Sequence, residues 1–291
     1  MKANKASRTA QYMALFRAIE TTRPLGIRLF NDPYATAFLN TGLKKAAQLS
    51  RIPFIRDIVQ SIIYRKIPGA LSSGIARTKY IDDLLYYAIN NGAQQVLILG
   101  AGFDTRGVRL SFLRNTSVIE IDHPNTSSLK IEAMRSSMGR LPGNINYHQL
   151  DFNKESLDDM LTWNPIDLSR PTAIIWEGVT NYLTPSAIEN MFRFLSRFAG
   201  GSYIIFTYVH QKVLDSPESY YGAEKLLNDL DKIEERWTFG FRPEELKDYL
   251  NERGWALLED KGATEYRRKY MPQNTERGYE FYRVAFAKKR K

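Results

Sequence analysis

Two closely spaced glycines and a later aspartate are the residues of this chain best placed to bind a nucleoside. Gly100 and Gly102 follow the apolar run 96–99, and Asp122 follows the next apolar run, 118–121. An apolar run that ends in glycines is typical of a buried strand that turns sharply into a helix. Glycine has no Cβ, so the backbone can turn tightly and a ligand can approach the amides, while Asp122 can accept hydrogen bonds from both ribose hydroxyls.

The residues beside these glycines indicate which kind of nucleoside fits. A dinucleotide-binding turn has a third glycine where Thr105 stands, because its helix packs close to the strand and presents free amides to a pyrophosphate. Phe103 and Asp104 narrow the same space, and Asp104 would add negative charge beside two phosphates. The alternative is a tight turn with Asp104 as a helix cap, and we expect Asp104 to be a cap in either case. The ligand we expect is S-adenosylmethionine, which has no phosphates and carries a positive sulfonium.

Composition limits the classes of protein to which the chain can belong. Its 291 residues are 43% hydrophobic and 12% aromatic, which suffices for a large core and fits one domain spanning residues 1–291. The absence of cysteine excludes a disulfide framework, a thiolate metal site and a cysteine nucleophile. Three scattered histidines, His123, His148 and His210, are too few for a zinc site, so no metal is expected.

The charged residues bear on location and partners. The first 22 residues mix basic and acidic side chains without a sustained apolar stretch, so we expect no signal peptide, no membrane span or membrane partner, and a cytoplasmic protein. The net charge of +9 appears diffuse, with dense basic runs at 267–269 and 288–291. A terminal basic tail is usually solvated, and no nucleic-acid-binding motif accompanies the runs, so nucleic acid is not the expected substrate. The oligomeric state is left open.

From residue 92 onward, strand and helix patterns alternate. Strands are expected near 96–99, 117–121, 145–149, 173–176, 202–209, 255–259 and 282–288, and helices near 105–113, 125–138, 154–162, 185–199 and 242–253. This order predicts an α/β fold with a doubly wound, Rossmann-like sheet. The sheet is expected to be mostly parallel and to end in an antiparallel C-terminal hairpin.

Residues 1–91 and one inserted segment are expected to be helical. Apolar side chains recur at helical spacing over 8–20, 55–67 and 76–90. Asp32 is expected to cap a short helix that begins at Pro33. A further amphipathic helix is expected over 216–236. Because open α/β sheets bind ligands at the carboxyl ends of their strands, residues 1–91 and helix 216–236 are expected to form a lid over the cofactor-binding core, 92–291.

Six short motifs are distributed over the chain, at 31–35, 76–82, 99–106, 121–124, 151–152 and 176–179. Together they resemble the leucine carboxyl methyltransferase-like family of class I S-adenosylmethionine-dependent methyltransferases. Many methyltransferases have an acid at the end of the first strand and a third glycine in the turn, and both are absent here. These departures are usual for this family. The resemblance implies an S-adenosylmethionine-dependent enzyme.

The resemblance also implies roles at the methionyl end of the cofactor. Arg77 would bind the methionyl carboxylate, since a guanidinium pairs with a carboxylate through two hydrogen bonds. Glu177 would face the methionyl ammonium, and a charge at the end of a core strand needs such a partner. Gly100 and Gly102 would let the backbone reach the methionyl and ribose portions. Arg106, in the first turn of the next helix, is expected to point away from the site.

The nucleoside end would be held by three further residues. The resemblance implies that Asp122 binds the ribose hydroxyls. It implies that Asp151 accepts a hydrogen bond from the adenine amine and that Phe152 flanks the adenine ring.

Methyl transfer from a sulfonium requires alignment of the acceptor with the methyl group, and it needs no metal or covalent nucleophile. A carboxylate acceptor is already a nucleophile, whereas a hydroxyl benefits from a general base. Tyr182, Tyr208 and His210 are the candidate catalytic residues, although a histidine in a loop can equally serve as a cap.

The leading hypothesis is therefore an O-methyltransferase that acts on a carboxylate or hydroxyl of a small molecule. One alternative is methylation of a protein C-terminal carboxylate. A second is a nicotinamide-dependent oxidoreductase, against which Thr105 argues. A third is a non-catalytic nucleotide-binding or RNA-associated module, suggested only by the basic charge.

Overall fold

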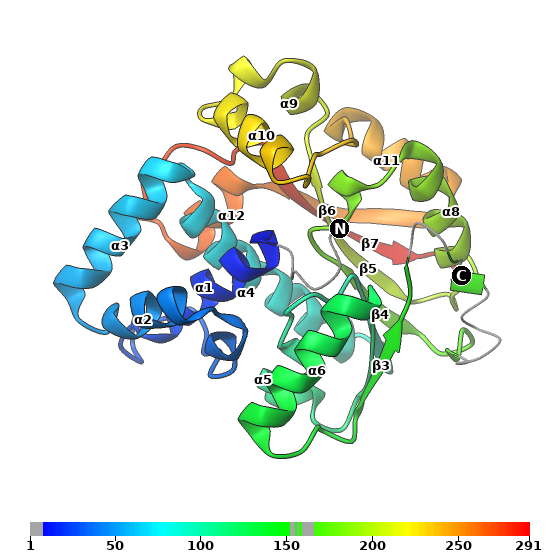
Figure 1. The fold of residues 1–291 in the computed structure, drawn as a ribbon. Helices are drawn as coiled ribbons and strands as arrows, with labels where there is room; N and C mark the ends of the chain where they lie inside the picture. The colour runs from blue at the N-terminus through cyan, green and yellow to red at the C-terminus, as the bar shows by residue number, and fades with distance from the viewer. Residues whose placement is uncertain (1–7, 152–154, 156, 159–165) are drawn as a thin grey trace.

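A seven-stranded sheet forms the centre of the computed structural model, which describes residues 8–151, 155, 157–158 and 166–291 (Figure 1). The strands are β1 (Gln95–Leu99), β2 (Ser117–Asp122), β3 (Ile145–Gln149), β4 (Thr172–Trp176), β5 (Tyr203–Val209), β6 (Trp255–Gly262) and β7 (Tyr282–Lys289). Their order is β3-β2-β1-β4-β5-β7-β6. The first five strands are parallel, and β7 is antiparallel to both β5 and β6. The predicted fold class is confirmed.

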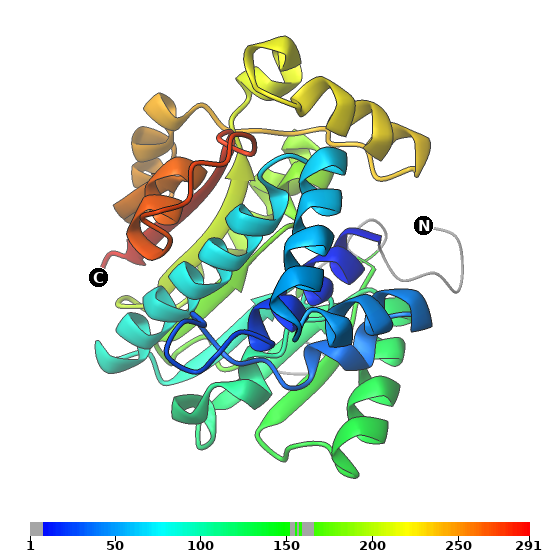
Figure 2. The same cartoon turned by 90° about the vertical axis from the view of Figure 1, so that its left-hand side faces the viewer.

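Helices cover the sheet and extend beyond one of its edges. They are α1 (Arg8–Thr21), η1 (Ala35–Phe38), α2 (Thr41–Leu49), α3 (Pro53–Lys66), α4 (Ala70–Asn90), α5 (Arg106–Arg109), η2 (Ser111–Leu113), α6 (Pro124–Met138), η3 (Thr180–Tyr182), α8 (Pro185–Leu195), α9 (Lys212–Asp215), η4 (Pro217–Ser219), α10 (Ala223–Lys232), α11 (Pro243–Glu252) and α12 (Ala263–Tyr270). In Figure 2, α3 lies nearest the viewer, and the segment from α9 to α10 stands above the rest of the fold. None of the helices in the described part of the chain has the length and apolar character needed to cross a bilayer.

Alternate residues of the central strands fill two separate apolar cores. On β1, Leu97 and Leu99 pack into the core that α8 and α11 cover. Val96 and Ile98 pack into the opposite core, under α4 and α12. Both faces of a parallel sheet are covered by helices, so its strands are apolar throughout. This explains why the run at 96–99 does not alternate with polar residues.

A third core joins the N-terminal helices to the rest of the protein. Leu15, Phe16 and Ile19 of α1 pack with Leu71 of α4 and with Phe103, which follows the glycine turn. Helix α1 is thus packed as tightly as the helices that cover the sheet. Its apolar face contributes to stability as well as to the shape of the site.

Several elements differ from the sequence-based expectation. The helix expected over 105–113 is interrupted at Leu110, which has an extended backbone. The helix expected over 216–236 is divided into η4 and α10, with Gly222 between them at φ 77°. Helix α2 lies within the region 1–91 that was expected to be helical but was not placed individually, and α12 was not expected. The helix expected over 154–162 lies largely outside the described residues.

Two local expectations can also be compared with the structure. Asp32 Oδ1 accepts the amide of Ala35 at 3.1 Å, but the residue at the N-cap position is Tyr34, so the prediction that Asp32 is the cap is wrong. The short helix begins at Ala35 instead of Pro33. In the basic run 267–269, Arg267 is buried, and its Nη1 donates to the carbonyl oxygen of Glu276 at 3.0 Å. That arginine is therefore structural.

Replacing Ile19 with alanine tests whether α1 belongs to the core. Ile19 is fully buried, so Ile19→Ala is expected to lower the free energy of unfolding by about 2–5 kcal/mol. The exposed Ile27→Ala is the matched control and is expected to change it by less than about 0.5 kcal/mol. Urea denaturation measures both variants. Equal stability of the two variants would show that α1 is only loosely attached.

Candidate functional site

A cavity of about 1230 Å³ lies at the carboxyl ends of β1, β2 and β4. Gly102, Asp122 and Glu177, which follow or end these strands, line it together with α1, the end of α3 and α10. The N-terminus of α1 is joined to the segment after α10, because the amide of Arg8 donates to Glu235 Oε1 at 2.9 Å. Strand ends and N-terminal helices thus enclose one space.

The two glycines of the turn adopt left-handed backbone conformations. Gly100 has φ 63° and Gly102 has φ 46°, a region that other residues rarely adopt. A Cβ on Gly100 would also overlap the side chain of Val179. The amide of Gly100 donates to the carbonyl oxygen of Ile121 at 2.8 Å, and that of Gly102 donates to Asp122 Oδ2. Both amides are engaged within the protein, so these glycines contribute space to the site and not free donors.

Asp122 is fixed by backbone hydrogen bonds at the end of β2. Its Oδ2 accepts the amide of Gly102, and its Oδ1 accepts the amide of His123 at 2.6 Å. Burial raises the pKa of Asp122, while these two amides act in the opposite direction. Each carboxylate oxygen has a second lone pair that can accept another hydrogen bond. The carboxylate is therefore oriented before any ligand binds.

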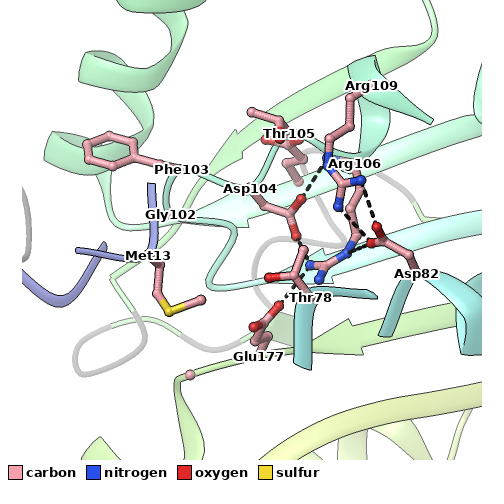
Figure 3. A network of polar contacts seen from close by, with 12 residues as sticks. Met13, Thr78, Asp82, Gly102, Phe103, Asp104, Thr105, Arg106, Arg109 and Glu177 are labelled. Carbon is pink, nitrogen blue, oxygen red and sulfur yellow. Dashed lines mark hydrogen bonds and ion pairs between the residues drawn. The ribbon is translucent and has the colours of Figure 1, made fainter. Parts of the chain in front are cut away.

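Arg106 lies at the centre of a buried ion-pair cluster (Figure 3). Its Nε donates to Asp82 Oδ1 at 2.8 Å, and its Nη1 donates to Asp104 Oδ2 at 2.5 Å and to Glu177 Oε2 at 2.8 Å. Arg109 binds Asp82 through two hydrogen bonds of 2.7 Å. The expectation that Arg106 points away from the site is wrong. Three carboxylates from three separate segments surround it, and a local pattern cannot reveal such partners.

Glu177 connects this cluster with Arg77. Arg77 Nε donates to Glu177 Oε1 at 2.9 Å, so each oxygen of Glu177 accepts from a different arginine. Arg77 Nη2 donates to the sulfur of Met13 at 3.2 Å, and a thioether is a weak acceptor. The guanidinium lies 4.4 Å from the centre of the Tyr282 ring, a cation–π distance.

The charges of the cluster are stable against titration. Burial alone would raise the pKa of Asp104, but Arg106 and further cations outweigh it and lower this pKa to about 2. The pKa of Glu177 is lowered in the same way, because Arg106 and Arg77 outweigh its burial. Asp104 also accepts the amide of Arg106 at 2.7 Å, but Thr105 is the residue at the N-cap position of α5, so the prediction that Asp104 is the cap is wrong. Both carboxylates are ionised at neutral pH.

Two other predicted binding residues follow β3. Asp151 lines the cavity, and its Oδ2 lies 3.6 Å from Nε2 of His123. Phe152 lies outside the described residues.

The candidate catalytic residues are divided between the cavity and other regions. Tyr182 lines the cavity, and its hydroxyl donates to Thr9 Oγ1 at 3.4 Å. His210 is not among the described residues that line the cavity, and its Nδ1 accepts the amide of Lys212 at 3.1 Å, as a loop cap does. Tyr208 is also absent from the described lining and donates to Asp260 Oδ2 at 2.7 Å. Only Tyr182 of these three is placed to meet a ligand.

Three aromatic residues of the lining were not singled out from the sequence: Trp237, Tyr279 and Tyr282. Tyr279 has φ 64°, which is rare for a bulky residue, and its ring stacks on Tyr282 with the centroids 6.0 Å apart. Tyr279 and Tyr282 reach the cavity because the C-terminal segment returns to the sheet beside α4. The preceding Gly278 was the one local sign of an unusual backbone there.

The residues that the structure describes contain no group of three or more side chains placed to bind a metal ion.

Comparisons with known proteins agree with this geometry. A sequence profile of the family described as leucine carboxyl methyltransferase matches residues 10–196, more than half of the chain. A protein of Mycobacterium sp. (strain MCS), provisionally named an S-adenosyl-L-methionine-dependent methyltransferase, is 28% identical over 63% of this chain and 66% of its own length. A Streptomyces coelicolor protein with the same kind of provisional name is 33% identical over 62% of this chain and 61% of its own length. The chain thus spans less than two thirds of these relatives.

Solved structures share the fold over nearly the full chain. A provisionally named methyltransferase from Thermobifida fusca YX has a TM-score of 0.60 at 19% identity and covers 95% of this chain and 94% of its own. A DUF574 family protein from Streptomyces avermitilis has a TM-score of 0.60 at 13% identity and covers 98% of both chains. At these identities the likeness is one of fold alone.

Removal of the central guanidinium tests the ion-pair cluster. Arg106→Gln leaves buried carboxylates without their partner and is expected to lower the free energy of unfolding by about 3–5 kcal/mol. Arg253→Gln is the matched control, because Arg253 binds Glu189 through three hydrogen bonds at a partly exposed position. Its loss is expected to be about 0–1 kcal/mol. Chemical denaturation at neutral pH measures both, and similar losses would contradict the central role of Arg106.

Proposed function

The chain belongs to the leucine carboxyl methyltransferase family, and we propose that it transfers the methyl group of S-adenosylmethionine to an oxygen atom of a small molecule. The family that the sequence motifs predicted is confirmed by the profile match over residues 10–196. The nicotinamide-dependent alternative and the non-catalytic alternative are set aside on this ground. The proposed acceptor group is a carboxylate or a hydroxyl.

The observation that carries the proposal is the pair formed by Arg77 and Glu177 in a cavity that also holds Asp122. Arg77 directs Nη2 at the Met13 thioether, and a ligand carboxylate is a far better acceptor for that group. Glu177 retains lone pairs beside it for an ammonium. An amino-acid carboxylate and its ammonium therefore fit side by side, as they occur in the methionyl part of the cofactor.

The nucleoside part fits the acids on the other side of the turn. Asp122, already oriented by two backbone amides, would accept the ribose hydroxyls. Asp151 would accept the adenine amine, with Phe152 as the proposed neighbour of the ring. Gly100 and Gly102 would provide the space in which the ligand passes close to the backbone.

The formal charge of the site also suits a sulfonium. Three arginines and three acids of the cluster, Arg77, Arg106, Arg109, Asp82, Asp104 and Glu177, balance one another. Asp122 adds a negative charge to this neutral cluster. The cofactor carries one net positive charge, and its demethylated product carries none, so the site favours the reactant over the product electrostatically.

The reaction itself is an in-line displacement at the methyl carbon. An acceptor oxygen forms the new carbon–oxygen bond while the carbon–sulfur bond breaks and its electron pair passes to sulfur. The products are a methyl ester or ether and a neutral thioether. The enclosure of the cavity by α1 and α10 would exclude water and align the acceptor with the methyl group.

The described lining of the cavity favours a carboxylate over a hydroxyl. Burial raises the pKa of Tyr182 to about 12, so Tyr182 is protonated at neutral pH and can donate a hydrogen bond but cannot act as a base. His123 is the one histidine among the described lining residues, and it faces Asp151 on the adenine side. A carboxylate needs no base. Tyr182 is then proposed to orient the acceptor by donating a hydrogen bond to it.

The cofactor assignment is tested by calorimetry with S-adenosylhomocysteine. The protein is expected to bind it and not to bind NAD. Asp122→Ala is expected to weaken binding by about 1–3 kcal/mol, the cost of a lost charged hydrogen bond. Asp248→Ala, which removes an exposed carboxylate on α11, serves as the control with unchanged affinity. Unchanged affinity in Asp122→Ala would remove Asp122 from the site.

The acceptor class is tested with S-adenosylmethionine labelled in its methyl group. Small carboxylic acids are expected to accept the labelled methyl group, whereas simple alcohols and phenols are not. Peptides with a free C-terminal carboxylate are tested alongside them, to compare a protein acceptor with a small one. Tyr182→Phe is expected to raise KM for the acceptor while the rate shows no new ionisation between pH 6 and 9, because the native hydroxyl is already neutral there. Labelling of alcohols alone would refute the carboxylate assignment.

A further inference from the structure

Most of the net positive charge is concentrated in one segment. Residues 21–66 contain eight lysines and arginines and two acids, a net charge of +6 out of the +9 of the whole chain. Asp32, one of the two acids, is buried and paired with Arg17 at 2.8 Å. Asp57 is therefore the one exposed acid in this segment, whose residues are all described. Two thirds of the net positive charge of the chain therefore lies in this one segment.

The same segment carries most of the exposed apolar side chains. Of the twelve large hydrophobic residues found exposed in the described part of the chain, seven lie between residues 25 and 62. We call them the α2–α3 patch: Leu25, Ile27, Leu49, Ile52, Phe54, Ile58 and Ile62. Phe54 is 73% exposed and Leu25 is 83% exposed. Single exposed hydrophobic residues are ordinary, but a group of this size indicates an interaction surface.

Helical spacing brings the three members of the patch on α3 together. Phe54, Ile58 and Ile62 are four residues apart and share one face of α3. Thr22 Oγ1 donates to the carbonyl oxygen of Ser50 at 3.2 Å, which joins the loop after α1 to the connection between α2 and α3. In Figure 2, α3 is the outermost helix on the side that faces the viewer.

Basic side chains border this apolar surface. Lys44 and Lys45 are exposed on α2, next in sequence to the patch. Arg65 lies three residues after Ile62 on α3 and continues the same helical row, and Arg51 is exposed in the turn before α3. Apolar residues in the middle and cations at the margins form the arrangement found in helices that lie on anionic membrane surfaces.

We propose that the α2–α3 patch docks onto the surface of an anionic lipid bilayer. The cations would contact lipid phosphates, and the side chains of Phe54, Ile58 and Ile62 would enter the boundary between headgroups and acyl chains. A second copy of the chain fits less well, because a symmetric contact would place two like-charged surfaces against each other. This proposal departs from the sequence-based expectation of no membrane partner, which was drawn from the absence of a sustained apolar stretch near the N-terminus.

Vesicle sedimentation tests the proposal with the full chain. The protein is expected to sediment with vesicles of phosphatidylcholine mixed with phosphatidylglycerol, to remain in solution with phosphatidylcholine alone, and to be released by high salt. The triple variant Phe54→Ser, Ile58→Ser, Ile62→Ser and the double variant Lys44→Glu, Lys45→Glu are each expected to lower the partition coefficient about tenfold or more. Leu258→Ser and Lys247→Glu, exposed on other elements, are the matched controls that keep wild-type binding.

Because the variants change only exposed side chains, their thermal unfolding temperature and their affinity for S-adenosylhomocysteine are expected to match those of the wild type. Equal binding to neutral and anionic vesicles, or undiminished binding of both patch variants, would overturn the proposal. Sedimentation velocity measures whether the protein forms dimers. Concentration-dependent dimerisation that the triple variant abolishes, without binding to either vesicle, would assign the surface to a second copy instead. Binding of RNA in place of vesicles would equally overturn the proposal.

Discussion

The structure of the site depends on the neutralisation of one buried guanidinium. Arg106 is 3% exposed and is surrounded by Asp82 from α4, Asp104 from the glycine turn and Glu177 from the end of β4. A buried charge is tolerated only when it is paired on all sides. Because the three acids come from separate segments, their common partner fixes how these segments meet. The position of Glu177 then determines where Arg77 is held.

The N-terminal helices serve stability and the site together. The apolar face of α1 packs with α4 and with Phe103, while Thr9 and Arg8 at its other end meet Glu235 beyond α10. A change in α1 therefore affects both the folded state and the wall of the cavity. The opposite side of the same region carries the α2–α3 patch. The N-terminal helices together thus bury apolar side chains, line the cavity and expose the α2–α3 patch to solvent.

The fold could be predicted from the sequence because its signals are local. Apolar runs such as 173–176 and the positive-φ glycines of the turn mark strands and their ends without reference to distant residues. Asp122, at a strand end, was found in the same way. Arg106 was misjudged because its partners Asp82 and Glu177 are 24 and 71 residues away. The sequence left His210 open between a base and a cap, because its position after β5 does not state which way the following loop turns.

Glu177 accepts hydrogen bonds from two arginines, Arg77 and Arg106. Its negative charge is established by the protein itself, as is that of Asp104, whose pKa is about 2. Lowered pKa values mean that these acids stay ionised until the pH falls below the usual range for carboxylates. An arriving zwitterion thus finds its counter-charges already present, and it neither takes up nor releases a proton there. If Arg77 and Glu177 hold the methionyl group as proposed, binding there would involve no proton uptake or release and little reorganisation of the charged side chains.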